Sequence, residues 1–269
     1  MRIYLPHDVW QPGEFAAFLA IGDSWFWYPK NNVLQALIEN PQLKPDYANI
    51  QMLGYNGAKL EEFVFGKYAD DLAHELQPRN RHYYSAILIS GAGNDAVDYR
   101  LGLFKNCSGA NSSDQCINNE AMAALLGKLA TALGALIDQV RRAYAADGSQ
   151  PPIFLHSYDY PIPDGRGFNL AALKITGPWL ASAMDDCFVP PDPELRKDIC
   201  RHLIDSLHDE FAQIAASADG IYLIDSRGCL QAPDYRDDWD NELHPSPRGF
   251  RRIIAERWIP VLKDRGFAG

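Results

Sequence analysis

The sequence predicts an α/β protein with a mainly parallel sheet. Of its 269 residues, 47% are hydrophobic, which is enough for a large core. The strongest apolar runs are continuous rather than alternating, which is typical of strands covered by helices on both faces. Helical patterns lie between these runs, as they do where helices join parallel strands.

Each apolar run ends at a turn residue, so the carboxyl end of each strand can be placed. The predicted strands are FAAFLAI (15–21), YANIQML (47–53), YYSAILIS (83–90), PIFLHSY (152–158) and GIYLIDS (220–226). The predicted helices lie near residues 32–39, 58–77, 120–146, 194–217 and 247–264. Two polar stretches, at about 100–119 and 159–193, are expected to be loop insertions. No repeat or linker interrupts the pattern, so we expect a single domain over residues 1–269.

Composition and charge argue against several classes of partner. The formal net charge is −10 and no basic stripe is present, so nucleic acid is not an expected partner. No unbroken apolar run approaches the length of a bilayer span, so we expect no transmembrane segment. The N-terminus lacks the apolar core of a cleaved signal peptide. We therefore expect a cytoplasmic protein, or one exported without such a signal. The sequence predicts no particular oligomeric state.

The five cysteines leave two pairings open. Cys107 and Cys116 bracket a polar loop that a disulfide could close, Cys187 and Cys200 are a second candidate pair, and Cys229 is left over. Their spacing matches neither zinc sites nor thioredoxin motifs, so no metal or cofactor is expected. We expect reduced cysteines unless the protein reaches an oxidising compartment, which would favour the loop disulfide.

Four residues suited to one reaction follow four predicted strands. Ser24 follows the first strand, Gly57 the second, Asn94 the third and His244 the last. The carboxyl ends of parallel strands border the ligand crevice. A serine hydrolase needs a hydroxyl, an imidazole that accepts its proton, and donors that hold the oxyanion. Some of the aromatic residues 25–28 should also face this crevice and favour an apolar acyl or aromatic group.

Four short motifs resemble those of the SGNH hydrolases, also called the GDSL esterases and lipases. They are GDS (22–24), GYNG (54–57), GAGND (91–95) and NELHP (241–245). The resemblance implies a flavodoxin-like three-layer α/β/α sandwich, with Ser24 as nucleophile and His244 as general base. It also implies an oxyanion hole made by the backbone N–H groups of Ser24 and Gly57 and the side-chain amide of Asn94.

The sequence departs from the family pattern at two positions. Ala92 replaces the glycine that usually stands two residues before the asparagine, a change that we expect to be minor. Asn241 stands where the acidic residue is usual, three residues before His244. We predict that Asp240 orients His244, because a carboxylate stabilises the imidazolium that forms during the reaction. Asn241, a backbone carbonyl and Glu242 are the alternatives.

These residues predict a serine ester hydrolase that works through an acyl-enzyme. Its expected substrate is a small-molecule or lipid ester, and no cofactor is implied. A carbohydrate O-deacetylase would use the same groups. The second alternative is a binding module that kept the fold and lost activity, because Asn241 removes the usual acid.

Overall fold

The computed structural model describes residues 1–29, 31–170 and 173–269. Its main sheet has six parallel strands in the order β1–β3–β2–β4–β5–β8. The strands are β1 (Arg2–Tyr4), β2 (Phe18–Gly22), β3 (Asn49–Gly54), β4 (Ala86–Ser90), β5 (Ile153–His156) and β8 (Ile221–Ile224). The five predicted strands are confirmed. The short strand β1 was not predicted, since three residues are too few to show a pattern.

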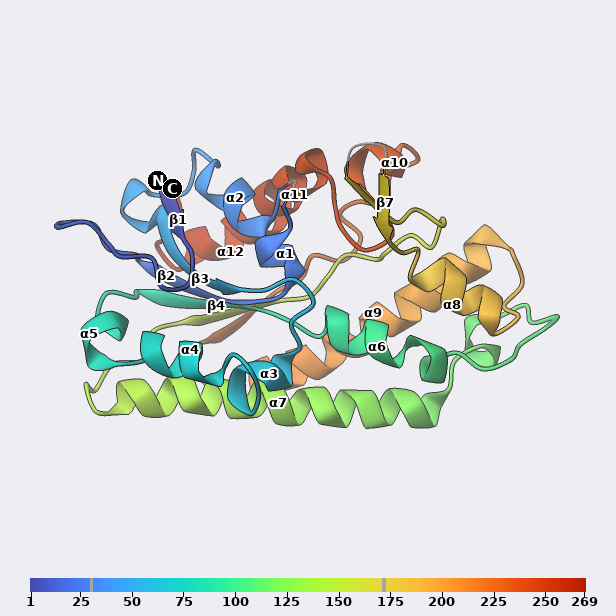
Figure 1. Cartoon of the computed structure of the whole chain (residues 1–269), viewed down its shortest axis with the longest axis horizontal. Coiled ribbons are helices and arrows are strands. Elements are labelled where there is room, and N and C mark those ends of the chain that lie inside the picture. The colour runs from blue at the N-terminus through green and yellow to red at the C-terminus, as the bar shows by residue number, and fades with distance from the viewer. Residues whose placement is uncertain (30, 171–172) are drawn as a thin grey trace.

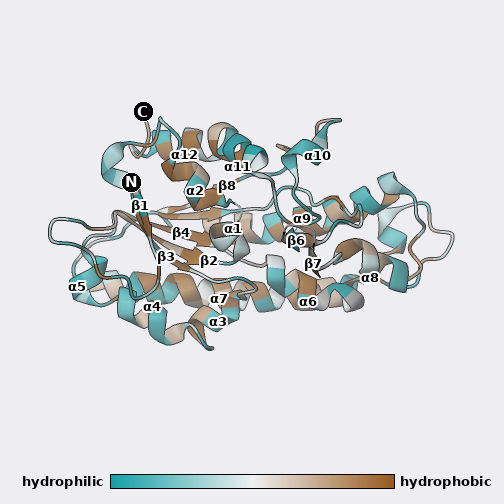
Figure 2. Ribbon diagram, turned by 45° about the horizontal axis from the view of Figure 1, so that its top comes forward, coloured by the Kyte–Doolittle hydropathy of each residue, from teal (hydrophilic) through white to brown (hydrophobic). Residues whose placement is uncertain are grey.

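Helices cover both faces of the sheet and confirm the three-layer α/β/α sandwich (Figure 1). One layer contains α2 (Val33–Ile38), α11 (Pro247–Ile253), a π-helical turn (Ile254–Trp258) and α12 (Ile259–Asp264). The other contains α3 (Leu60–Val64), α4 (Ala69–Glu75), α5 (Pro78–Arg81), α7 (Asn119–Ala145) and α9 (Pro193–Ala216). Both chain ends lie at the end of the molecule that carries β1 (Figures 1 and 2).

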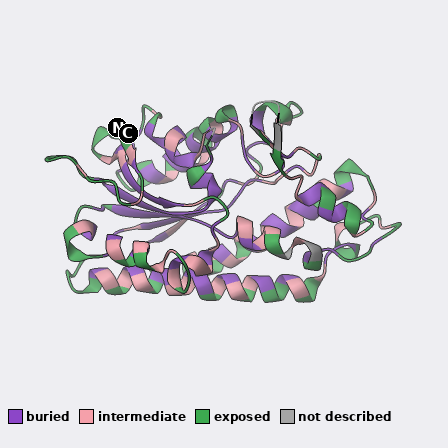
Figure 3. Cartoon of the chain, viewed as in Figure 1, coloured by how far each residue is buried: buried purple, intermediate pink, exposed green. Residues whose placement is uncertain are grey.

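The centre of the sheet is apolar and closed to solvent. Every residue of β2 and β4 is buried, and the strands form the brown and purple centre of Figures 2 and 3. Gly22 pairs with Gly54 of β3 and Ser90 of β4, so these three strands end at the same level. A Cβ on Gly22 would lie 2.6 Å from the Ser90 carbonyl oxygen, which explains the glycine. The loops after the three strands therefore meet.

Helix α7 differs from the expectation that no segment could span a membrane. By length and composition alone it is apolar enough to do so. Its buried face packs against α3, α6 (Gly93–Leu103) and α9, and contains Leu125, Leu129, Leu133, Leu136 and Val140. The rest of its surface combines small apolar residues such as Ala123 and Ala124 with charged residues such as Asp138 and Arg142. This pattern is also typical of an outer helix of a sandwich.

The two predicted insertions lie beyond the carboxyl ends of the central strands (Figure 1). In the first, α6 extends to Leu103 and a disulfide joins Cys107 to Cys116, so the expectation of reduced cysteines is wrong for this pair. Cys187 and Cys200 are not in disulfides. The second insertion forms a hairpin of β6 (Phe168–Leu170) and β7 (Leu173–Thr176), followed by α8 (Leu180–Asp186). Positions 171–172 of this insertion lie outside the described residues.

Candidate active site

Ser24 is the first residue of the short helix α1 (Ser24–Trp27), directly after β2. Asp23 caps this helix, because its carboxylate accepts the backbone N–H of Trp25 at 3.0 Å. The first N–H groups of a helix have no acceptor within the helix. The turn therefore presents the Ser24 hydroxyl and its backbone N–H together at the end of the central strand.

Asp23 also connects this turn to the ends of two neighbouring strands. Its Oδ1 accepts the Ser90 hydroxyl at 2.9 Å, and its Oδ2 accepts the Tyr158 hydroxyl at 2.5 Å. Tyr158 in turn accepts the backbone N–H of Gly93 at 3.2 Å. Burial raises the pKa of Asp23, although these donors lower it. The buried carboxyl thus fixes Ser24 relative to the start of α6, which carries Asn94.

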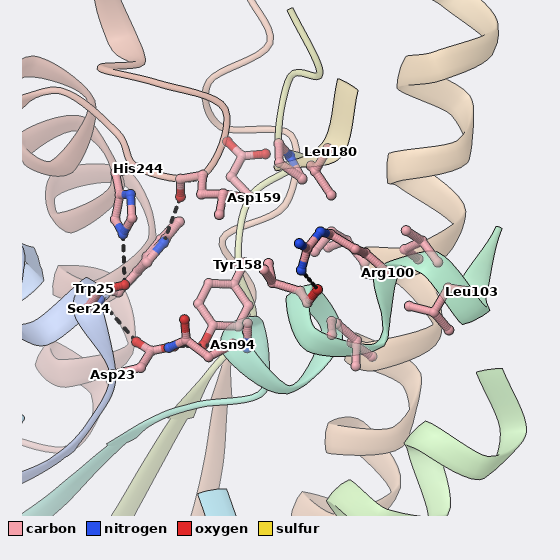
Figure 4. A pocket seen from close by; sticks show the side chains of 18 of the residues that line it. Asp23, Ser24, Trp25, Asn94, Arg100, Leu103, Tyr158, Asp159, Leu180 and His244 are labelled. Atoms are coloured by element: carbon pink, nitrogen blue, oxygen red, sulfur yellow. Dashed lines mark hydrogen bonds between the residues drawn. The ribbon is translucent and has the colours of Figure 1, made fainter. Parts of the chain in front are cut away.

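His244 lies against Ser24, as the sequence predicts for a nucleophile and its base. The Nε2 atom of His244 is 2.7 Å from the Ser24 hydroxyl oxygen (Figure 4). Ser246 caps α11, accepting the N–H of Gly249, and Pro247 is the first residue of that helix. The backbone N–H of Ser246 also donates to the Asp238 carbonyl at 2.9 Å. His244 is therefore held just before a rigid helix start.

Asn241, and not Asp240, faces the other nitrogen of His244. The amide oxygen of Asn241 is 3.2 Å from Nδ1 of His244 and accepts the backbone N–H groups of Leu243 and His244, both at 3.0 Å. Because this oxygen is only an acceptor, Nδ1 carries the proton and donates it. The remaining nitrogen, Nε2, is then free to accept the Ser24 proton.

Solved structures that resemble this chain include a lipase and an esterase. Comparison with family models and with curated proteins found no match. The lipase Lip_vut3 from a goat rumen metagenome superposes with a TM-score of 0.57 at 13% identity, over 94% of this chain and 98% of that one. The family 3 carbohydrate esterase of Clostridium thermocellum gives 0.51 at 15%, over 95% and 100%. A GDSL-like lipase of Bacteroides ovatus gives 0.51 at 11%, over 95% and 55%.

The chain has the SGNH hydrolase fold. The identities are far too low to transfer an activity, so these relatives establish the architecture alone. In this SGNH fold, Ser24 follows the strand at which the chain reverses its direction across the sheet, since β3 and β4 flank β2 on opposite sides. Such switch points are where open α/β sheets bind ligands.

The two carboxylates considered as orienters of His244 have other partners. The Asp240 carboxylate accepts the Tyr28 hydroxyl and lies 3.4 Å from the amide nitrogen of Asn241. The expectation that Asp240 contacts His244 directly is therefore corrected, since the adjacent turn places Asn241 there instead. Glu242 accepts four backbone N–H groups, from Gly165, Trp179, Leu180 and Ala181, and so anchors the second insertion.

Of the predicted oxyanion donors Asn94 and Gly57, only Asn94 is among the residues that line the pocket. Asn94 lines the same pocket as Ser24 and His244, and its amide nitrogen donates to the Ala58 carbonyl at 3.0 Å. This bond holds the Gly57–Ala58 turn next to Asn94. Gly57 itself is exposed, has a φ of +78° and is not among the pocket residues. Asp95 accepts the N–H of Leu60 at 3.3 Å and so joins the start of α6 to the start of α3.

An apolar pocket opens beside Ser24 (Figure 4). Its volume is about 750 Å³, including the part that is open to solvent. Helices α6, α8 and α9 supply most of its wall, which includes Ala96, Val97, Leu103, Leu180, Leu203, Ile204 and Leu207. A side chain of the first helix, Trp25, forms the part nearest Ser24, and its ring nitrogen donates to the Leu243 carbonyl at 3.0 Å. The site can thus accept an apolar group next to the Ser24 hydroxyl.

Tyr28 is the site residue whose role the sequence did not suggest. It stacks on the His244 ring, with centroids 4.2 Å apart and planes at 4°, and its oxygen accepts a hydrogen bond from Asn241 at 3.1 Å. A signal was present, because residues four apart lie on one helix face and Tyr28 follows Ser24 by four. Trp27, in contrast, is 39% exposed.

Burial determines the charge state of the imidazole. It lowers the pKa of His244 to about 4, while the nearby Asp240 acts in the opposite direction. The imidazole is therefore neutral at pH 7, the state in which it can accept a proton. Among the described residues, no group of three His, Cys, Asp or Glu side chains is arranged to hold a metal ion.

Proposed function

We propose that the protein is a serine ester hydrolase that works through an acyl-enzyme. The observation that carries this proposal is the 2.7 Å contact between the Ser24 hydroxyl and the neutral His244 imidazole. A serine hydroxyl becomes a nucleophile only when an adjacent base removes its proton. The lipase and esterase activities of the structural neighbours named above support an ester as the substrate.

In the proposed reaction, the Ser24 oxygen attacks the ester carbonyl as Nε2 of His244 takes its proton. The backbone N–H of Ser24 and the amide of Asn94 then donate to the carbonyl oxygen as it becomes negative. We include the N–H of Gly57 in this oxyanion hole, since the Asn94–Ala58 hydrogen bond brings its turn to the same edge. His244 returns the proton to the leaving alcohol, and water releases the acid by the reverse steps.

We further propose that Asn241 keeps His244 in the productive tautomer and that Asp240 acts from behind it. The Asp240 carboxylate lies next to the amide nitrogen of Asn241, so its charge favours an imidazolium on the far side of the amide. Tyr28 bonds to both residues and keeps them in register. In this proposal Asp240 therefore acts on the His244 ring only through Asn241.

The pocket favours an acyl chain over an acetyl group. Its wall beside Ser24 is made largely of aliphatic side chains, which gain free energy by covering methylene groups at about 0.8 kcal/mol each. A carbohydrate O-deacetylase would leave this surface unused. The fold and the hydroxyl–imidazole pair are compatible with either substrate, so chain length is the property to measure.

The proposal is tested with nitrophenyl esters of increasing acyl length and with a fluorophosphonate probe. We expect the wild-type protein to hydrolyse medium-chain esters faster than the acetate and to react covalently with the probe. The Ser24→Ala variant should fold, lose both reactions and serve as the blank. Turnover that persists in a folded Ser24→Ala protein would exclude the serine mechanism, and an inert wild-type protein would favour the binding-module alternative.

A further inference from the structure

Arg100 is the one lysine or arginine among the described residues that line the pocket, and it belongs to the part of the wall that α6 contributes. The residues of α6 that line the pocket and whose side chains are described are Gly93, Asn94, Ala96, Val97, Arg100 and Leu103. They recur at the three- and four-residue spacing of one helix face. This face leads away from Ser24, from the polar Asn94 at the first turn to Leu103 at the last. Arg100 lies between them.

The Arg100 guanidinium uses little of its hydrogen-bonding capacity within the protein. Of its five N–H groups, Nη1 donates to the Val97 carbonyl at 2.6 Å, and no carboxylate of the described residues pairs with it. In Figure 4 the guanidinium stands among the lining side chains, beside that carbonyl oxygen. Burying a cation under an apolar ligand without a partner is unfavourable. An aliphatic acyl chain would cover the apolar side chains of this wall but would leave the Arg100 guanidinium without a partner.

The two acidic residues of the pocket are already occupied. Asp159 accepts the backbone N–H groups of Tyr160, Gly228 and Leu230. Asp23 holds the Ser24 turn through Ser90 and Tyr158, as described above. Neither carboxyl is hydrogen-bonded to Arg100, so the partner that matches the guanidinium is an anion brought by the ligand. Guanidinium groups bind carboxylates strongly, through paired hydrogen bonds.

We propose that Arg100 binds an anionic group at the far end of the substrate's acyl chain, which makes the substrate an ester of a medium-length dicarboxylic acid or of a similarly anionic acyl group. This inference rests on the proposed function and names its substrate class. The apolar wall covers the methylene groups, and Arg100 receives the terminal charge. Reaction at Ser24 proceeds as above and leaves the anion unchanged.

The helix geometry sets the length of that chain. Arg100 follows Asn94 by six residues, about 9 Å along the helix axis. Long side chains lean back toward the helix N-terminus by roughly one turn, in keeping with the contact to Val97, so the anion lies about 4.5–9 Å from the level of Asn94. An extended chain covers about 1.2 Å per bond. Roughly four to seven bonds therefore separate the reacting carbonyl from the anion, which fits adipoyl, pimeloyl and suberoyl groups.

The test compares nitrophenyl esters of these three acyl groups, ended either by a carboxylate or by the neutral carboxamide. We expect the ratio of kcat/KM, carboxylate over carboxamide, to be about tenfold or more in the wild-type protein. Arg100→Gln should bring the ratio near one and Arg100→Lys should restore part of it. Arg142→Gln, at an exposed arginine of α7, is the matched control and should keep the wild-type ratio. A wild-type ratio of one or less, or a ratio that survives in Arg100→Gln, would overturn the proposal.

A binding measurement separates this inference from the proposed function. If the wild-type protein hydrolyses the carboxamide-ended esters without favouring the carboxylate, the esterase stands and the anion site fails. If it hydrolyses none of them, calorimetric titration with the monoamide of suberic acid and with its diamide decides. If the monoamide binds more tightly than the diamide and this difference disappears in Arg100→Gln, the anion site is supported even without catalysis. If the two bind equally well to the wild-type protein, the anion site is rejected.

Discussion

The ring of Tyr28 lies flat against the imidazole of His244, with centroids 4.2 Å apart and planes at 4°. Tyr28 ends the helix that begins with Ser24, and its backbone N–H donates to the Ser24 carbonyl at 2.6 Å. The short helix α1 thus carries Ser24, the proposed nucleophile, at its start, and Tyr28, which stacks on the proposed base, caps its end. This explains part of the run of aromatic residues 25–28, because two of them, Trp25 and Tyr28, shape the site.

Replacing Tyr28 separates the effect of the stack from that of the hydroxyl. Tyr28→Phe keeps the stacked ring and loses the bonds to Asp240 and Asn241, so we expect kcat/KM to fall by about tenfold, as for other outer partners of site residues. Tyr28→Ala also removes the ring that stacks on the imidazole, so kcat/KM should fall by about a hundredfold or more. Ester hydrolysis and near-ultraviolet circular dichroism check both variants. If Tyr28→Phe is as inactive as Tyr28→Ala, the hydroxyl matters more than the platform.

Asn241 and Asp240 should contribute unequally to turnover. We expect Asn241→Ala to lose about a hundredfold or more in kcat, because it removes the acceptor that fixes the His244 tautomer. Asp240→Asn should lose only about tenfold, because it removes a charge that acts through the amide. The measurement is single-turnover acylation by a nitrophenyl ester, with thermal unfolding as the control for folding. A larger loss in Asp240→Asn than in Asn241→Ala would restore the order predicted from the sequence.

The pH dependence follows from the lowered pKa of His244. Because this pKa is about 4 in the folded protein, the imidazole stays neutral down to about pH 5 and becomes protonated below about pH 4. We expect kcat/KM to be level from about pH 5 to 8 and to fall tenfold per pH unit below about 4. An imidazole with the ordinary histidine pKa of about 6.5 would instead place this fall at a higher pH. Samples returned from pH 4 to pH 7 should recover full activity.

A carboxylate at position 241 should raise the pH at which kcat/KM falls on acidification, the acid limb of the pH profile. Asn241→Asp places a negative charge beside Nδ1 and so raises the pKa of His244. The fall in kcat/KM should then occur at a higher pH than in the wild-type protein. In Asp240→Asn it should occur at a lower pH, because Asp240 raises the pKa of His244. An acid limb that is the same in all three proteins would show that another group controls it.

Ala92 carries a conformational cost that its place in the motif did not reveal. The residue is buried and has a φ of +93°, in the left-handed region that favours glycine. We expect Ala92→Gly to stabilise the protein by about 0.5–1 kcal/mol. This figure is the backbone strain that glycine relieves in the folded state, minus the free energy that its greater conformational entropy gives to the unfolded chain. Urea unfolding measures the difference. A loss of stability instead would show that the buried methyl group outweighs the strain.

Local pattern in the sequence was sufficient for much of the architecture. The continuous apolar runs predicted the five main strands, because strands buried on both faces need no polar alternation. It did not reveal α6, whose polar composition from Gly93 to Leu103 lacks an apolar stripe. Nor did it settle the cysteines, since a pairing depends on where two loops fold. The expectation of one domain over residues 1–269 stays a prediction.

The sequence by itself determined which residues meet at the site, and the tertiary structure decided how they are paired. Ser24, Asn94 and His244 each follow a parallel strand, and such strands end at one edge of the sheet, so their meeting could be foreseen. The partner of Nδ1 could not, because Asp240, Asn241 and Glu242 are adjacent in one turn and its backbone alone determines where each points. That turn directs Asn241 to His244, Asp240 to Tyr28 and Glu242 to the start of α8. The contacts of Asp240 and Glu242 join this turn to elements more than sixty residues away, which no local pattern encodes.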